Sequence, residues 1–253
     1  MARIRKPAEG VWNIVRFNWQ FYALAAGALC LLLVAASLYL GVRAYVFALA
    51  MLLSMPVVIS LLVSYYVYDY SGLYSFDWLT IEQPATPATI VNIHAGFDET
   101  SHLLREKFPL ANLRVFDFYD PALHTELSIR RARVACAPFP GTESVQPHAL
   151  PLTRASADWV FVLLSAHEIR QPVQRVAFLK ELRRVLQPQG KLIVVEHLRD
   201  PANFMAYTIG FLHFYSRTTW LNAFQQARFQ LLQEKKITPF VSAFTLQADG
   251  TAA

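Results

Sequence analysis

The sequence predicts an α/β fold, in which a parallel β-sheet has helices on both faces and follows a hairpin of two membrane-spanning helices. Two observations lead to this prediction. Residues 17–40 and 44–68 contain no charged side chain. From residue 89 onward, short apolar segments alternate with segments of helical pattern. Apolar strands that alternate with helices are typical of a doubly wound, mostly parallel sheet covered on both sides.

The two uncharged segments are each long enough to cross a membrane. A hydrocarbon core of about 30 Å needs roughly 20 residues at about 1.5 Å per residue, and only Gly41, Val42 and Arg43 separate the segments. A cleaved signal peptide would have a shorter apolar stretch, and a helix of a soluble core rarely stays apolar on every face for so long. We therefore expect a retained, tight helical hairpin.

The charges around this hairpin predict its orientation. Cytoplasmic flanks of membrane spans are rich in lysine and arginine. Four basic residues precede the first span, against the single Glu9: Arg3, Arg5, Lys6 and Arg16. Arg43 in the opposite turn argues weakly the other way. We expect a multi-pass protein of two spans with both termini in the cytoplasm and the lipid bilayer as its partner.

The remaining composition disfavours several classes of function. The excess of 18 basic over 14 acidic residues in 86–253 is modest and scattered, and no cluster of basic and aromatic residues indicates nucleic-acid binding. The two cysteines, Cys30 and Cys136, are far apart and fit free thiols of a reducing compartment. No spacing typical of a metal site is visible in the sequence, so no metal is expected.

Two prolines, Pro84 and Pro87, separate the hairpin from the alternating region and mark a linker. We therefore divide the chain into a hairpin segment, a linker and a domain, at 1–70, 71–88 and 89–253. The pattern predicts strands at 89–94, 113–120, 157–165 and 191–197, and helices at 98–108, 121–135 (opened by Pro121) and 172–186. Ligands of such sheets bind at the carboxyl ends of the strands, so the expected site begins where the first strand ends, in IVNIHAGFDETS at 90–101.

Residues 90–246 resemble the class I S-adenosylmethionine-dependent methyltransferases, particularly the branch with quinone-biosynthesis and related small-molecule enzymes. The segment FLKELRRVLQPQGKLIVVEH at 178–197 is similar to the helix-turn-strand of that family. The segment ALPLTRASADWVFVLLSAHEI at 149–169 resembles its fourth-strand region, and 219–246 resembles its last helix and closing hairpin. The resemblance implies a Rossmann-like, seven-stranded sheet and S-adenosylmethionine as cofactor.

The opening motif departs from the family pattern V-L-D-L-G-C-G-T-G. Asn92 takes the place of the acidic residue, His94 that of the first glycine and Asp98 that of the third. Gly96 remains, and AGFDET is similar to the GAGxDT loop of leucine-carboxyl methyltransferases. Two readings stay open, a variant loop that holds the cofactor and a degenerate, inactive one. On the first reading, the cofactor-binding residues of this loop are Asn92, His94, Ala95, Gly96 and Asp98.

The resemblance implies further cofactor contacts. A carboxylate at the end of the second strand accepts hydrogen bonds from both ribose hydroxyls in this family. Asp120 is the expected residue and Asp117 the reserve, although either could instead cap the following helix. Gln146 lies four residues before the LPL turn, where the family often places its adenine-binding residue.

Residues at the ends of the later strands are candidates for chemistry. Methyl transfer needs a general base only when the acceptor must lose a proton, and the catalytic candidates are His167, Glu168 and His197. His213 and Tyr215 lie in an aromatic insertion at 204–220, which in this family covers the substrate pocket. We expect a membrane-anchored methyltransferase acting on a lipid, quinone or other amphipathic small molecule. The alternative is an inactive methyltransferase-like membrane protein with a binding or assembly role.

Overall fold

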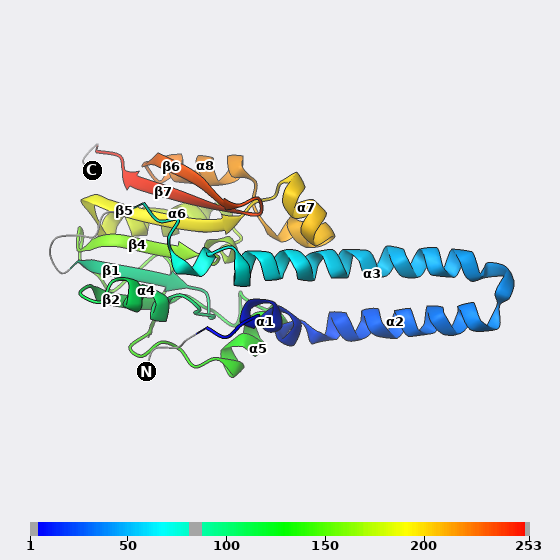
Figure 1. The fold of residues 1–253 in the computed structure, drawn as a ribbon. Coiled ribbons are helices and arrows are strands. Elements are labelled where there is room, and N and C mark those ends of the chain that lie inside the picture. Colours follow the sequence, from blue (N-terminus) through cyan, green and yellow to red (C-terminus); the bar gives the residue numbers. More distant parts are fainter. Residues whose placement is uncertain (1–4, 81–87, 251–253) are drawn as a thin grey trace.

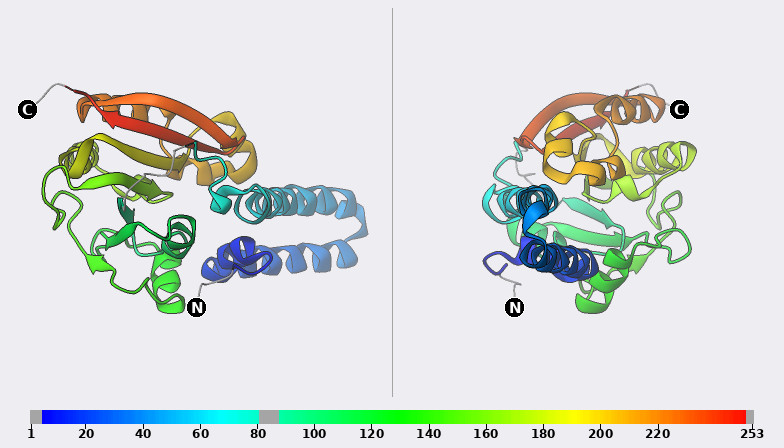
Figure 2. Two further views of the ribbon diagram at one scale, coloured as in Figure 1. Left: turned by 60° about the vertical axis from the view of Figure 1, so that its left-hand side comes forward. Right: turned by 90° about the vertical axis from the view of Figure 1, so that its right-hand side faces the viewer.

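The structure, a computed structural model, describes residues 5–80 and 88–250. It consists of a sheet-containing domain from which two long helices project side by side (Figure 1). The carboxyl ends of the parallel strands point toward these helices (Figure 1). Figure 2 shows from two further sides that the helical hairpin leaves the domain at this one end.

The domain is built on one seven-stranded sheet of order β3-β2-β1-β4-β5-β7-β6. Neighbouring strands from β3 to β5 are parallel, whereas β7 is antiparallel to both β5 and β6. The chain order reverses between β1 and β4, which creates a switch point there. This confirms the predicted seven-stranded, mostly parallel sheet. The strands are β1 Thr89–His94, β2 Asn112–Asp117, β3 Glu143–Ser144, β4 Ala157–Leu163, β5 Leu186–His197, β6 Phe229–Thr238 and β7 Val241–Ala248.

Helices bury both faces of this sheet. In α6, Pro172–Val185, the residues at 175, 178, 179, 182 and 185 are all buried, a spacing that puts one helical face on the sheet. Trp220 and Phe224 of α8, Arg217–Gln226, complete that layer. The opposite face packs against Leu104 of α4, Ser101–Lys107. Two further helices flank the strand ends, α5 Leu127–Ala135 and α7 Pro201–Tyr207.

The segment between the hairpin and the first strand is part of the core of the domain. Val67, Leu73 and Phe76 are at most 1% exposed and pack with strand residues such as Phe161. They lie in or beside two short helical turns, η2 Tyr66–Tyr70 and η3 Leu73–Ser75. Three residues of the expected linker, Leu73, Phe76 and Trp78, are therefore packed against the sheet, and its residues 81–87 lie outside the described part of the chain.

The two uncharged segments form α2, Trp19–Leu38, and α3, Arg43–Tyr65, joined by a turn, η1 Leu40–Val42. A short helix, α1 Glu9–Phe17, precedes them. Both long helices have the length and composition to cross a membrane, and only 6% of their most apolar windows is buried. Hence these helices are not the core of the domain. Of the basic residues used to predict orientation, Arg3 lies outside the described residues.

Several element boundaries differ from the sequence prediction: β5 begins at Leu186 rather than at residue 191, α4 begins at Ser101 rather than at residue 98, and the chain around residue 120 differs most. β2 ends at Asp117 rather than at residue 120, and the next helix begins at Leu127 rather than at Pro121. The reason is a local turn. The Asp120 carboxylate accepts a hydrogen bond from the Ala122 N–H at 2.8 Å, and its carbonyl accepts one from the His124 N–H at 2.8 Å. Aspartate competes in this way with regular backbone structure.

Candidate active site

Gly96 forms the sharp turn after β1. Its φ is +92°, in the left-handed region that favours glycine. A Cβ atom here would lie 2.9 Å from Cδ2 of Tyr119 and 3.1 Å from Cδ of Arg133. The Gly96 N–H donates to Nδ1 of His94 at 3.2 Å, which ties the turn to the end of the strand. Both the backbone and the available space therefore require a glycine at this position.

Asp98 and His94 present two buried polar atoms next to this turn. One Asp98 oxygen, Oδ1, accepts from the N–H groups of Thr100 and Ser101 at 3.0 and 2.9 Å and so caps α4. The other, Oδ2, lies 4.0 Å from Nε2 of His94, and neither atom has a hydrogen-bond partner among the described residues. Burial lowers the pKa of His94. Because Nδ1 accepts from Gly96, the neutral ring carries its proton on Nε2, leaving one donor and one carboxylate oxygen for a polar ligand.

Asn92 and Ala95, also expected at the cofactor, occupy different environments. The Asn92 amide donates to Oγ1 of Thr100 at 2.9 Å and to Oγ of Ser101 at 2.8 Å, so it fastens β1 to the start of α4. Its Oδ1 is buried and has no partner among the described residues. Ala95 is buried directly before the turn. Asn92 therefore stabilises the loop by joining the strand before it to the helix after it.

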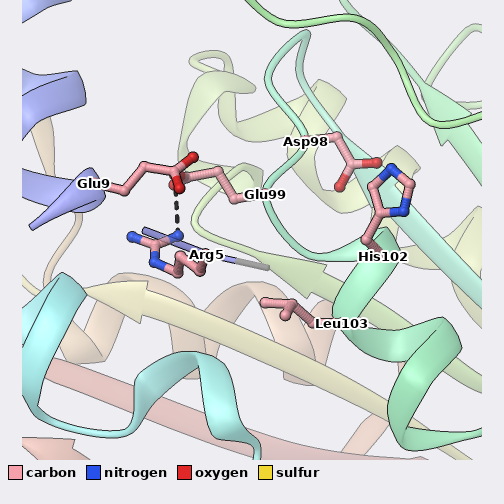
Figure 3. A pocket seen from close by; sticks show the side chains of 6 residues that line it. All are labelled: Arg5, Glu9, Asp98, Glu99, His102 and Leu103. Atoms are coloured by element: carbon pink, nitrogen blue, oxygen red, sulfur yellow. Dashed lines mark hydrogen bonds and ion pairs between the residues drawn. The ribbon is translucent and has the colours of Figure 1, made fainter. Parts of the chain in front are cut away.

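The loop is also held from the N-terminal side of the chain. Glu99 accepts hydrogen bonds from Tyr74 at 2.7 Å, Arg5 at 3.2 Å and Asn13 at 3.3 Å. The ring of Phe97 meets that of Phe17 in α1 edge-on at 5.5 Å. A small cavity of about 20 Å³ remains between Arg5 and α4, with room for about one water, and Figure 3 shows the side chains that line it. The segments on both sides of the hairpin thus contact the cofactor loop directly.

The end of β2 places Asp117, and not Asp120, beside this loop. Asp117 is paired in register with His94 across the two strands. Its carboxylate accepts from the Tyr119 N–H at 2.9 Å and forms an ion pair with Arg133 of α5, whose guanidinium stacks on Tyr119 at 4.4 Å. Asp120 lies three residues further on, in the turn described above. Gln146, the expected adenine contact, is exposed two residues after β3.

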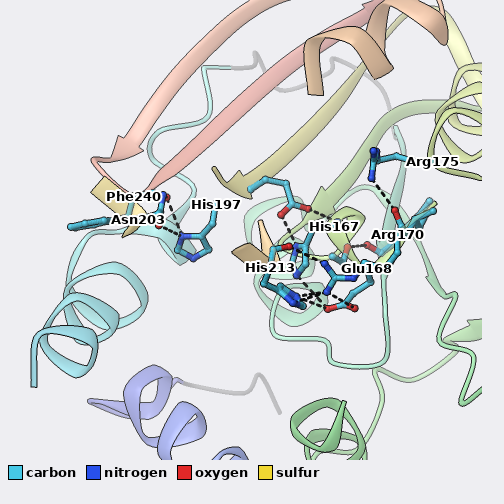
Figure 4. A network of polar contacts seen from close by, with 12 residues as sticks. His167, Glu168, Arg170, Arg175, His197, Asn203, His213 and Phe240 are labelled. Atoms are coloured by element: carbon cyan, nitrogen blue, oxygen red, sulfur yellow. Dashed lines mark hydrogen bonds and ion pairs between the residues drawn. The ribbon is translucent and has the colours of Figure 1, made fainter. Parts of the chain in front are cut away.

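A second polar cluster lies where β4 and β5 end (Figure 4). The backbone N–H of His167 donates to Oε1 of Glu196 at 3.1 Å, and its Nδ1 lies 2.7 Å from Oε2. Nε2 of His167 lies 3.3 Å from Oε1 of Glu168. Burial alone would lower the pKa of His167, but the two carboxylates outweigh burial and raise it to about 10. Burial likewise opposes ionisation of Glu168, yet hydrogen bonds from His167 and His213 hold its pKa well below the ordinary value.

His213, Arg170 and Glu126 complete this cluster. Nε2 of His213 lies 3.4 Å from Oε1 of Glu168, and its Nδ1 lies 3.2 Å from Glu126. Arg170 donates to the His213 carbonyl at 2.8 Å and also contacts its ring. Sequence reasoning placed His213 only within the aromatic insertion and did not single out Arg170 or Glu126. Arg170 follows Glu168 by two residues, but local spacing could not have indicated Glu126 or His213, because both are far from Glu168 in the chain.

His197, the third catalytic candidate, lies apart from these residues. Its Nε2 accepts from the Tyr68 hydroxyl at 2.7 Å, and its Nδ1 lies 3.0 Å from the carbonyl oxygen of Phe240 and 3.1 Å from Oδ1 of Asn203. Burial lowers the pKa of His197 to about 4, so the ring is neutral and both nitrogens are engaged. The ring stacks on Phe214 at 4.7 Å. This geometry suits a residue that positions its neighbours.

Comparisons with known proteins identify a family match and similar folds. Residues 96–194 match the family model described as a methyltransferase domain. A geranyl diphosphate C-methyltransferase from Streptomyces coelicolor A3(2) superposes with a TM-score of 0.52 at 11% identity, over 74% of this chain and 82% of that one. A protein from Pyrococcus horikoshii OT3 gives 0.51 at 14% identity, over 70% and 90%. A methyltransferase from Aquifex aeolicus gives 0.48 at 17% identity, over 76% and 97%. No curated protein matches the chain in sequence.

The family match and the seven-stranded sheet define a class I S-adenosylmethionine-dependent methyltransferase domain. The protein is a methyltransferase that uses S-adenosylmethionine as its methyl donor. The loop after β1 fits this cofactor. Gly96 allows the sharp turn that the loop makes, and Oδ2 of Asp98, which has no hydrogen-bond partner among the described residues, suits a cationic amino group.

Proposed function

We propose that the protein is a membrane-anchored methyltransferase whose acceptor is a lipid, a quinone or another amphipathic small molecule. The observation that carries this proposal is the exposed apolar surface of α2 and α3. Leu24, Leu31 and Leu52 are 70%, 73% and 68% exposed, and each leucine left in water forgoes about 1.5–3 kcal/mol. Two helices of this length and composition, apolar on all faces, suit the hydrocarbon core of a bilayer.

Residues at the base of the hairpin suit the surface of a membrane. Trp12 and Trp19 are 62% and 56% exposed, and such amphipathic rings favour the membrane–water interface. A groove beside them is lined by Trp19 and by three arginines, Arg16, Arg130 and Arg131. Arginines at this level attract the anionic headgroups of cytoplasmic leaflets. These charges support the orientation expected from the sequence.

The aromatic insertion supports the assignment of an amphipathic acceptor. α7 lies against the base of α3 (Figure 1), and a short helix, η5 Thr208–His213, follows it. Four apolar residues of this stretch are at least half exposed: Phe204, Met205, Ile209 and Leu212. η5 then ends at His213, in the polar cluster. An acceptor could therefore keep its apolar tail among these residues while its polar head reaches His167 and Glu168.

We assign the cofactor to the loop after β1. His94, Gly96 and Asp98 would hold its methionine part, with Ala95 and Asn92 shaping the loop. Asp117 at the end of β2 would accept the ribose hydroxyls, in place of the Asp120 expected from the sequence, and Gln146 would lie near the adenine. When bound, the cofactor would supply a methyl group on a sulfonium sulfur, open to in-line attack at the methyl carbon with the neutral thioether as the leaving group. His167 and Glu168 would orient that nucleophile, and His197 would act by positioning Phe214.

The acceptor class is testable by where a transferred methyl group goes. We expect the full-length protein, supplied with methyl-labelled S-adenosylmethionine and a membrane lipid extract in micelles, to place label in the organic phase on extraction. The amphipathic head and tail of the acceptor are the reason. Gly96→Val, which blocks the cofactor loop, is the control and should leave that phase unlabelled. Label that enters only water-soluble acceptors from a cell extract would contradict the amphipathic assignment.

The topology is testable with single cysteines in a Cys30→Ser, Cys136→Ser background. Gly41 and Gly250 both have open space around a would-be Cβ, so Gly41→Cys and Gly250→Cys should be tolerated. We expect an impermeant maleimide to label Gly41→Cys in intact cells, because the turn lies across the membrane. Gly250→Cys should be labelled only after the membrane is opened. The reverse pattern, or labelling of neither site before lysis, would refute a hairpin with cytoplasmic termini.

A further inference from the structure

We propose that His167, Glu168 and His213 form a binding site for a divalent cation of the zinc type. One ligand atom from each residue lies within 4.8 Å of the others. Oε1 of Glu168 is 3.3 Å from Nε2 of His167 and 3.4 Å from Nε2 of His213. Ligands at about 2.1 Å from a tetrahedral zinc ion are separated by about 3.4 Å. These two separations therefore already match those of a loaded site.

In each of the two histidines, the ring nitrogen that faces away from Glu168 lies next to another carboxylate. Nδ1 of His167 lies 2.7 Å from the fully buried Glu196, and Nδ1 of His213 lies 3.2 Å from Glu126. In metal sites a carboxylate on one ring nitrogen orients the imidazole and raises the basicity of the other. Here both rings are held so that Nε2 faces Glu168. An ordinary ion-pair network does not require this arrangement at two histidines.

The carboxylates around the two histidines supply negative charge that would favour a bound cation. Three carboxylates, those of Glu126, Glu168 and Glu196, surround the two rings. Arg170 supplies positive charge, with its guanidinium 3.7 Å from Glu168 and against the ring of His213. Its side chain is 41% exposed, so it can turn toward solvent. A bound cation would take over the contact of Arg170 with Glu168 and His213.

The ligand set selects the kind of cation. Two imidazoles and one carboxylate suit zinc and neighbouring transition metals, whereas magnesium and calcium prefer oxygen ligands. Three protein ligands leave a coordination position open, as in catalytic zinc sites. On the proposed function, on which this role rests, that position would hold a hydroxyl oxygen of the acceptor. The hydroxyl would lose its proton to solvent more readily, and its lone pair would attack the methyl carbon while the carbon–sulfur pair stays on sulfur.

Zinc titration of the full-length protein in detergent, in competition with a chromophoric chelator, tests the site. We expect one Zn²⁺ per chain, and no competition from Mg²⁺. Glu168→Gln and His213→Ala should each weaken binding by at least about 100-fold, since each removes a direct ligand. His148→Ala, which removes an exposed histidine elsewhere, should have no effect. Arg170→Gln should bind as well as the unchanged protein or better.

A second variant tests the site even if the variants that remove a metal ligand fail to fold, because it changes an exposed residue that only contacts a ligand. Glu126 is 46% exposed, so Glu126→Gln should fold and should weaken zinc binding about 10- to 100-fold, as loss of an outer partner does. S-adenosylmethionine titrations on the same samples should be unchanged in every variant. No stoichiometric zinc, or equal zinc affinity in Glu126→Gln, His213→Ala and the unchanged protein, would overturn the metal site. The methyltransferase assignment would stand if cofactor binding persists.

Discussion

Gly96→Val is expected to reduce S-adenosylmethionine affinity by more than about 100-fold, which corresponds to about 2.7 kcal/mol. Two physical effects act together. A β-branched residue is strongly disfavoured at the φ of +92°. Its Cβ would also push on Tyr119 at 2.9 Å and Arg133 at 3.1 Å, the side chains that lie where the end of β2 meets the loop. Isothermal titration with the full-length protein measures the loss.

Gly141→Val provides the matched control. Gly141 has a similar φ of +83°, but nothing lies within 4 Å of a would-be Cβ. Both variants therefore carry the backbone strain, and only Gly96→Val fills the loop. We expect Gly141→Val to lower thermal stability to a comparable degree without loss of cofactor affinity. An affinity of Gly96→Val within about threefold of the unchanged protein would place the cofactor elsewhere.

The second large effect is expected at Asp117. Charge-assisted hydrogen bonds of the kind a carboxylate makes to ribose hydroxyls contribute roughly 1.5–3 kcal/mol. Asp117→Ala should therefore weaken S-adenosylmethionine binding about 10- to 150-fold. Asp120→Ala should change affinity less than about threefold, because that carboxylate caps a turn with the Ala122 N–H. Parallel titrations of the two variants compare the residues directly.

Arg133→Ala separates a cofactor role of Asp117 from a merely structural one. It removes the same ion pair but leaves the carboxylate in place, with Oδ1 still bonded to the Tyr119 N–H and Oδ2 released. We expect Arg133→Ala to bind the cofactor at least as tightly as the unchanged protein, with thermal stability lowered as in Asp117→Ala. If Arg133→Ala loses affinity as Asp117→Ala does, the ion pair and not the carboxylate matters. If only Asp120→Ala loses affinity, the ribose ligand expected from the sequence is correct.

Much of this fold could be predicted from local patterns. The absence of charge between residues 17 and 40 and between 44 and 68 predicted the two long helices to within a few residues of their ends. β4 is apolar on both faces, and β1 is rich in β-branched residues; both strands were predicted for these reasons. The end of β2 was not, because Phe118 stays buried after the strand has ended. Burial continues there while the backbone follows the turn formed by Asp120.

The candidate site was less predictable because its contacts join distant parts of the chain. Arg5 and Glu99, which fix the cofactor loop, are 94 residues apart. The approach of His213 to Glu168 depends on η5 folding back over the end of β4. The position of His167 could be found by resemblance, but its partners could not. Only the folded domain brings Glu196 next to Nδ1 of His167 and Glu126 next to Nδ1 of His213.

The packed segment after α3 has a mechanical consequence. Val67 and Phe76 are buried in the sheet domain, and the Tyr68 hydroxyl is bonded to His197 at the end of β5. The hairpin is therefore joined to the domain at this end by a packed segment and not by a flexible linker. If the hairpin spans a bilayer, the active site is held at a set height and tilt above the lipid. In that case the enzyme would favour acceptors by position: only those whose reactive atom lies at the right distance from the hydrocarbon boundary would reach the active site.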